Sequence, residues 1–307
     1  MTNFNLNLWM LALLCATMLL TPSCQSEIMP SFTVSYVSGD GSKHEMDVFY
    51  NESYLDISKP TILYFHGGSW VSGTRSKIHQ RYREPMLRQL IDKGFIVFSV
   101  DYRLVGLGRG YMEGAVSDCR DALSFVLKNA DNLGVDTTKI GFWGSSAGAH
   151  LAMMTAFADT LASKYVKFVV DDFGPVDIHG MSLAVPEWGR ELVSDMIFNL
   201  GSKNLQKFDS LISVYSPINY DTKIPVLIFH GEDDNVVNIS QSQMLHEHLP
   251  NNSHFITFPG NAHGLKNLDS SQLRQYVESF ETFMDTVLDV GFGSMQALSA
   301  DRMSVAK

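Results

Sequence analysis

Two adjacent serines stand between glycines in the segment GFWGSSAGAHLAMM, residues 141–154. A serine hydroxyl becomes an effective nucleophile only when a neighbouring base takes its proton. The preceding KIGFW has the composition of a buried strand and the following AHLAMMTAFA that of a helix, which predicts a sharp strand-to-helix turn. A nucleophile at such a turn needs very small residues two positions away on each side. Only the register GSSAG, residues 144–148, meets this need, so Ser146 is the candidate nucleophile.

A base must accompany this serine, and the sequence contains ten histidines. His263 is the candidate because it follows the strand-like run HFITFPG in the short loop GNAHG, where small neighbours leave its ring free. His150 falls in the helix after the serines and is expected to pack in the interior. Five others fall in helical or loop-like surface patterns: His44, His79, His179, His246 and His248.

A histidine that works as a base needs a carboxylate to orient it. The run PVLIFHGEDDNVV places Glu232, Asp233 and Asp234 directly after the strand-like segment that precedes HFITFPG. Each of the three could instead be an ordinary solvated loop charge. The residues alone therefore leave the choice of acid open.

Hydrolysis through a tetrahedral intermediate also needs N–H donors where the carbonyl oxygen becomes negative. Ala147, directly after Ser146, supplies one backbone N–H. The second is expected from the segment YFHGGSW, in which Gly67, Gly68 or Ser69 follows a strand and glycine lets the backbone approach a substrate. The pattern does not decide which of these three points inward, and the alternative is a simple tight turn.

An alternation of strands and helices positions these residues. The runs SFTVSYVS and HEMDVFYN flank a turn at Gly39 to Ser42 and predict an opening hairpin. Six later runs read as buried parallel strands: TILYFHGG, FIVFSVDYR, KIGFWG, KFVVDDFG, PVLIFHG and HFITFPG. Five segments have helical periodicity: 76–93, 111–130, 147–161, 240–249 and 270–288. The sequence thus predicts an α/β fold whose mostly parallel sheet carries helices on both faces.

The alternation is interrupted between Pro175 and Pro217, where the chain is partly helical and contains no convincing strand. Such an insertion after one strand and before the next predicts a small lid, residues 176–216, over the ligand-binding edge of the sheet. The main domain is expected to span residues 31–290. Residues 291–307 are expected to form a tail.

The first 26 residues contain no charged side chain and include an apolar run at 6–20. This pattern predicts a signal peptide over residues 1–23, followed by a linker over 24–30, and hence an exported protein. The Cys24 context is similar to a bacterial lipoprotein cleavage box, so Cys24 is a candidate lipid anchor, with a plain cleaved signal as the alternative. Cys119 is the one cysteine in the body of the chain and is expected to be a packed thiol.

The composition excludes some partners. A formal charge of −10 with no run of Lys or Arg argues against binding to nucleic acid. No HExxH or comparable ligand spacing is present, and the chemistry described above requires no metal, so neither a metal nor another cofactor is expected. The oligomeric state is not predicted.

The motifs together resemble the α/β-hydrolase carboxylesterases of the hormone-sensitive-lipase and feruloyl-esterase-like type. The resemblance covers about residues 36–288 and is carried by GSSAG, HGGSW, DYR, HGEDDNVV and AHG. It includes the chain order serine, acid, histidine. It implies that the acid is Asp234, with Asp233 as the alternative, and that Asp101 to Arg103 has a structural role. The chain departs from the usual HGGG motif at Ser69.

The resemblance implies a serine carboxylesterase in which Ser146 attacks, His263 transfers the proton and Asp234 orients the histidine. Small esters are the expected substrates, including acetyl or feruloyl esters of saccharides, by analogy only. Trp188, in the predicted lid, is a candidate substrate contact. The alternatives are a peptidase of the prolyl-oligopeptidase type, which lacks room here for its usual propeller domain, and a non-catalytic binding protein.

Overall fold

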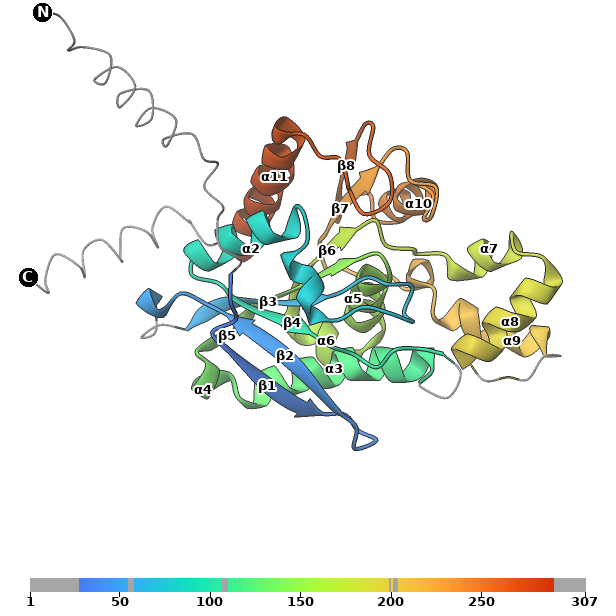
Figure 1. Ribbon diagram of the computed structural model, residues 1–307, viewed down its shortest axis with the longest axis horizontal. Coiled ribbons are helices and arrows are strands. Elements are labelled where there is room, and N and C mark those ends of the chain that lie inside the picture. The colour runs from blue at the N-terminus through green and yellow to red at the C-terminus, as the bar shows by residue number, and fades with distance from the viewer. Residues whose placement is uncertain (1–27, 55–57, 107–109, 199, 201–203, 290–307) are drawn as a thin grey trace, which may run out of the picture.

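The protein is described by a computed structural model over residues 28–54, 58–106, 110–198, 200 and 204–289 (Figure 1). The predicted signal peptide, the Cys24 anchor site and the predicted tail at 291–307 lie outside these residues. None of the helices within them is long and apolar enough to cross a membrane.

One sheet organises the described residues, with strand order β1-β2-β4-β3-β5-β6-β7-β8. Its strands are β1 (Phe32–Val37), β2 (Lys43–Phe49), β3 (Lys59–Phe65), β4 (Ile96–Val100), β5 (Val135–Ser145), β6 (Val166–Asp172), β7 (Val226–Gly231) and β8 (Ser253–Phe258). The pairs β1–β2 and β2–β4 are antiparallel and the other pairs are parallel. The predicted opening hairpin and the mostly parallel sheet are therefore confirmed.

The side chains of the central strands alternate between two hydrophobic cores. In β3, Leu63 and Phe65 face the core shared with α3 (Met112–Lys128) and α5 (Ala147–Ala158). Ile62 and Tyr64 face the core shared with α2 (Arg83–Asp92) and α11 (Ser270–Leu288). This period of two follows from the pleat of a strand, and it explains why every residue of β3 and β4 is buried. Helices cover both faces of the sheet (Figure 1).

The helices outside the insertion are α2 (Arg83–Asp92), α3 (Met112–Lys128), α4 (Ala130–Leu133), α5 (Ala147–Ala158), α6 (Thr160–Tyr165), α10 (Ser240–His248) and α11 (Ser270–Leu288). Two expectations about their extent are wrong. The segment 76–93 is not one helix, because Arg81 has a left-handed φ of 59° between a 3₁₀ turn (Arg75–His79) and α2. The helix expected at 147–161 ends at Ala158, where Asp159 accepts hydrogen bonds from two N–H groups of α6 and begins a new helix.

The interval between β6 and β7 folds as helices α7 (Ile178–Leu183), α8 (Glu187–Phe198) and α9 (Leu205–Val214), and its described residues contain no strand. Ile178 of α7 and Phe208 and Ile212 of α9 form a small core, against which Val193 and Phe198 of α8 pack. They extend to one side of the sheet (Figure 1). Trp188 is 73% exposed on α8.

Candidate active site

Ser146 lies at the turn between β5 and α5, with φ 55° and ψ −121°. This left-handed backbone is strained for a residue with a side chain, and it turns the chain sharply from strand to helix. The flanking glycines leave no room for a larger residue. A Cβ on Gly144 would lie 2.4 Å from the carbonyl oxygen of Gly148, and one on Gly148 would lie 2.0 Å from that of Phe65. The need for small neighbours in the GSSAG register is met.

The side chains of Ser146, His263 and Asp234 form one chain of hydrogen bonds. Ser146 Oγ lies 3.0 Å from His263 Nε2, and His263 Nδ1 lies 2.7 Å from Asp234 Oδ2. A carboxylate only accepts, so Nδ1 donates to it and the neutral ring has Nε2 free to accept the serine proton. The three residues follow β5, β7 and β8, whose parallel carboxyl ends meet at one edge of the sheet.

The structure selects Asp234 among the three acidic residues of its loop. Asp234 is 5% exposed, whereas Glu232 and Asp233 are exposed, and the Glu232 carboxylate accepts a hydrogen bond from Thr257. Burial alone would raise the pKa of Asp234. Hydrogen bonds from His230, His263 and the N–H groups of Val236 and Val237 outweigh it and hold that pKa below its ordinary value. Asp234 is therefore a stable anion beside His263.

His230 is a contact of this site that the sequence patterns did not reveal. Its buried Nε2 donates to the carbonyl of Val237 at 2.9 Å and lies 3.4 Å from Asp234 Oδ2, while Nδ1 lies 2.7 Å from Ser242 Oγ. The only sequence signal was a histidine inside the apolar run VLIFHG. His230 thus contacts Oδ2 of Asp234, the same carboxylate oxygen that accepts from His263.

The backbone after β3 runs beside Ser146. A Cβ on Gly67 would lie 3.3 Å from the Cβ of Ser146 and 2.7 Å from the carbonyl oxygen of Ser145. Within the described residues, no hydrogen bond occupies the backbone N–H of the four predicted donors, Gly67, Gly68, Ser69 and Ala147. The loop is held by Lys77 Nζ, which donates to the Gly67 carbonyl at 3.0 Å. These N–H groups are available to a negative oxygen near Ser146.

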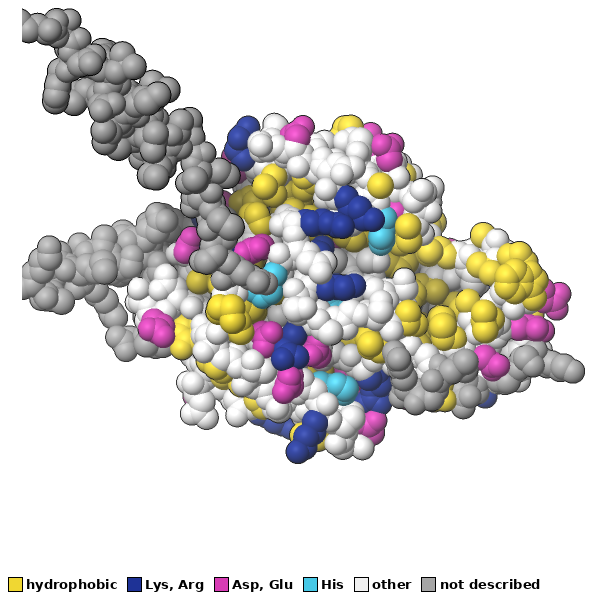
Figure 2. Space-filling model, in the orientation of Figure 1, with side chains coloured by type: hydrophobic (Ala, Val, Ile, Leu, Met, Phe, Trp, Pro, Cys, Tyr) yellow, Lys and Arg dark blue, Asp and Glu magenta, His cyan; other side chains and the backbone are white. Residues whose placement is uncertain are grey.

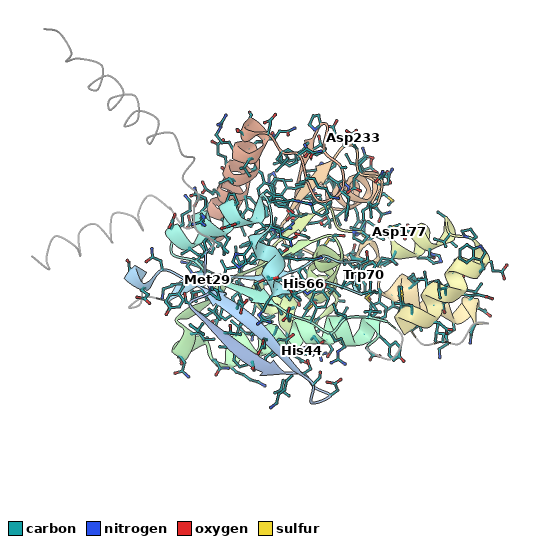
Figure 3. The ribbon with its side chains drawn as sticks, viewed as in Figure 1. Met29, His44, His66, Trp70, Asp177 and Asp233 are labelled. Carbon is teal, nitrogen blue, oxygen red and sulfur yellow. The ribbon has the colours of Figure 1, made fainter. Side chains whose placement is uncertain are left out.

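Trp70 links this loop to α5 and to the helical insertion. Its Nε1 donates to His150 Nδ1 at 3.1 Å, and His150 Nε2 donates to the carbonyl of Tyr215, which follows α9, at 2.7 Å. Burial lowers the pKa of His150 to about 4, so the ring is neutral and packed, as predicted. Figure 3 places Trp70 between His66 and the insertion.

Other residues singled out by the sequence are structural. Asp101 accepts hydrogen bonds from the backbone and guanidinium of Arg75, and Arg103 pairs with the buried Asp118. Cys119 is fully buried, as expected of a packed thiol. His44 is not in a helix or loop but in β2, where it lies 3.2 Å from Asp118. These contacts hold β2 and the segment after β4 against α3 and the 3₁₀ turn at Arg75–His79.

A cavity of about 290 Å³ opens at Ser146 and His263. Its lining includes Gly67, Gly68 and Ser69, and it is bounded by Phe173, whose ring centroid lies 5.0 Å from that of His263. Trp188 does not line it, so the structure gives no support to a substrate contact there. Within the described residues, no group of three or more His, Cys, Asp or Glu side chains could hold a metal ion.

The sheet, the strained turn and the positions of serine, acid and histidine define an α/β-hydrolase. The chain belongs to the BD-FAE family, whose sequence profile matches residues 46–249. The resemblance to carboxylesterases of the α/β-hydrolase type is thereby confirmed.

Curated relatives carry esterase names. The isoprenylcysteine alpha-carbonyl methylesterase ICME of Arabidopsis thaliana is 26% identical over 256 residues, which is 76% of this chain and 58% of that protein. Esterase LipC of Mycobacterium tuberculosis is 25% identical over 265 residues, 81% of this chain and 64% of LipC. The chain thus spans about three fifths of the length of these relatives.

Solved structures show the same fold. Propionate-bound esterase 2 of Thermogutta terrifontis has a TM-score of 0.65 and 21% identity, and the match covers 85% of this chain and 94% of that one. A truncated carbohydrate esterase from gut microbiota has a TM-score of 0.65 and 26% identity, with 85% of this chain and 99% of that one covered.

Proposed function

We propose that the protein is a serine carboxylesterase. The observation that carries this proposal is the hydrogen-bonded chain from Ser146 through His263 to the buried Asp234, at a cavity lined by backbone N–H groups. Membership of the BD-FAE family and relatives named as esterases support it.

In the first half-reaction, Ser146 Oγ attacks the ester carbonyl carbon while His263 Nε2 takes the hydroxyl proton. The carbonyl oxygen becomes negative and accepts hydrogen bonds from Ala147 N–H and from the Gly67 to Ser69 backbone. As the tetrahedral intermediate collapses, Nε2 gives the same proton to the leaving alcohol. Asp234 stabilises the imidazolium throughout.

In the second half-reaction, water replaces the alcohol. His263 Nε2 takes one proton from water as its oxygen attacks the acyl-enzyme, and then returns that proton to Ser146 Oγ when the carboxylic acid leaves. One ester and one water thus give one alcohol and one acid.

The proposed substrates are small esters, among them acetyl or feruloyl esters of saccharides. One observation supports this narrower proposal: a similar solved structure is named a carbohydrate esterase. The helices α7 to α9, which follow β6, are proposed to select the substrate as a lid. Profiling of acyl chain length against acetylated and feruloylated sugars tests both parts.

The activity is tested with p-nitrophenyl acetate and a fluorophosphonate probe. We expect hydrolysis and covalent labelling of the wild type, and loss of both in Ser146→Ala. A folded wild type that hydrolyses no ester and resists the probe, but still binds a saccharide, would favour a non-catalytic binding protein. Cleavage of peptides after proline in preference to esters would favour the peptidase.

Export is proposed from the uncharged, apolar start of the chain, with Cys24 as a candidate lipid anchor. Cell fractionation and mass spectrometry of the mature N-terminus test this. A start at Cys24 carrying lipid supports the anchor, an unmodified start near residue 24 supports a plain signal peptide, and an intact Met1 contradicts export.

A further inference from the structure

The cavity at Ser146 carries a charge opposite to that of the whole chain. The formal net charge is −10, yet the cavity lining contains four cationic side chains and no Asp or Glu. The four are Lys77, Arg81, Arg83 and Lys266. Figure 2 shows Lys and Arg side chains gathered beside a histidine in the middle of the face displayed.

Among the described residues, no carboxylate lies within 4.0 Å of any of the four cations. Arg75 and Arg103, by contrast, each pair with acidic side chains. Among the four, the charge of Arg83 costs the most free energy to bury, because this residue is only 5% exposed. Its Nε donates to the Lys77 carbonyl and Nη1 to Tyr82 Oη. Its Nη2 makes no hydrogen bond within the described part of the chain. Asp172 attracts this guanidinium, but the link between them runs through Tyr82, whose Oη donates to Asp172 Oδ2. Because no carboxylate pairs with Arg83 directly, an anionic ligand in the cavity would compensate for the burial of its charge.

The outer cations adjoin the loop that carries His263. Arg81 Nη1 lies 3.4 Å from the carbonyl oxygen of Gly264, and a Cβ on Gly264 would lie 2.9 Å from the same Nη1. Lys266 is exposed three residues after His263. The histidine that gives a proton to the leaving alcohol must lie within hydrogen-bond reach of the alcohol oxygen. The alcohol portion of an ester would therefore leave beside these cations.

We propose that the preferred ester carries an anionic group, such as a carboxylate or sulfate, on its alcohol portion, and that Arg81, Arg83 and Lys266 bind this group. The inference rests on the proposed carboxylesterase function. Coulomb attraction in a partly buried cavity is screened less than on an open surface, so the cations would raise kcat/KM by holding the ester in place.

The test compares three acetate esters of similar size: 4-acetoxybenzoate, 4-acetoxybenzenesulfonate and the neutral 4-acetoxybenzamide. The readout is the ratio of kcat/KM for each anionic ester to that for the amide, in the wild type and in the exposed double variant Arg81→Gln/Lys266→Gln. We expect the ratio to fall about tenfold in the double variant and to fall in wild type at 1 M salt. A ratio lost for the carboxylate alone or the sulfonate alone identifies which anion the site prefers.

The matched control is Lys164→Gln, an exposed lysine at the end of α6, ahead of the amino end of β6 and so at the edge opposite Ser146. Its ratio should equal that of wild type. An equal fall in Lys164→Gln, or no fall in the double variant, overturns the inference. The acyl side is tested with the ratio of kcat/KM for p-nitrophenyl hemisuccinate to that for p-nitrophenyl butyrate. If this ratio falls in the double variant and the ratio for the acetate esters does not, the anion lies on the acyl portion, and the assignment to the alcohol is overturned.

A binding measurement keeps this inference separate from the proposed function. Ser146→Ala protein is titrated calorimetrically with 4-hydroxybenzoate and 4-hydroxybenzamide, neither of which needs turnover. Tighter binding of the benzoate, lost when Arg81→Gln/Lys266→Gln is added, supports the anion site even if no ester is hydrolysed. If the wild type hydrolyses 4-acetoxybenzamide but neither assay shows a preference for the anionic compound, the anion site is overturned and the proposed esterase function stands.

Discussion

The hydroxyl of Ser145 lies 3.2 Å from Oδ2 of Asp172, to which it donates a hydrogen bond. The two residues are register partners at the ends of β5 and β6. Asp172 is fully buried and accepts further hydrogen bonds from Trp143, Tyr82 and Tyr276. The side chains of the adjacent serines therefore point in different directions: that of Ser145 toward the buried Asp172, and that of Ser146 toward His263.

Because the two serines have different partners, their substitutions should have different effects. Ser145→Ala removes one of several donors to Asp172, so it should cost about 1 kcal/mol of unfolding free energy and change kcat/KM for p-nitrophenyl acetate by less than about threefold. Ser146→Ala should lower kcat more than about 10⁴-fold, because Ser146 is the one nucleophile among the described residues that contacts His263. Denaturant unfolding and steady-state kinetics measure both. Equal loss of activity in the two variants would contradict the assignment.

Asp234 and Asp233 form a second matched pair. Asp234→Asn replaces the acceptor of the His263 Nδ1 proton with a group that can donate, so the ring loses the tautomer that activates Ser146. We expect kcat to fall by roughly 10⁴-fold in Asp234→Asn. The exposed Asp233→Asn should retain wild-type kinetics. If Asp234→Asn keeps its activity, a residue other than Asp234 is the acid that orients His263.

His230 is expected to act as a positioning residue through Asp234. His230→Phe removes the contact at 3.4 Å and the bond to Val237, which should lower kcat about tenfold while KM changes little. His230→Gln keeps an N–H donor and should recover part of kcat. If both variants lose stability but keep wild-type kcat, the role of His230 is purely structural.

Features that depend on local pattern were predictable from the sequence. Small residues around Ser146 and the apolar period of the strands are properties of adjacent residues, so the strand-to-helix turn and the sheet followed from them. The choice of Asp234 over its neighbours needed the resemblance, because solvent exposure does not show in the sequence. The break at Arg81 and the cations around the cavity could not be foreseen. They depend on how the loops after β3 and β8 meet in space.

Gly68 and Ser69 give a test of the loop beside Ser146. Gly68 has φ 139°, and a Cβ there would lie 1.9 Å from the carbonyl oxygen of Ser72. Gly68→Ala should therefore displace the loop and lower kcat by about 10²-fold, the cost of losing one oxyanion donor. Ser69 has φ 53°, which glycine adopts without strain, so Ser69→Gly should keep kcat. Steady-state kinetics decide, and a full-rate Gly68→Ala enzyme would exclude this loop from oxyanion binding.

Asp172 makes the stability of the protein depend on pH. Burial raises the pKa of Asp172 to about 6, although hydrogen bonds from Trp143 and Tyr82 oppose the shift. Between its ordinary pKa near 4 and this value, the folded protein binds more protons at Asp172 than the unfolded chain does. The unfolding free energy contributed by this residue must therefore fall as pH rises from about 4 to about 6, by about 3 kcal/mol in total.

Asp172→Asn removes this titration while keeping a side chain of similar size. We expect the unfolding free energy of wild type minus that of Asp172→Asn to decrease across the same pH interval and to level off above about pH 6. Urea unfolding of both proteins at several pH values measures the difference, and the slope decides the matter whatever the absolute stability of the variant. Parallel profiles would mean that Asp172 stays ionised in the folded protein. Its four hydrogen-bond donors would then outweigh its burial.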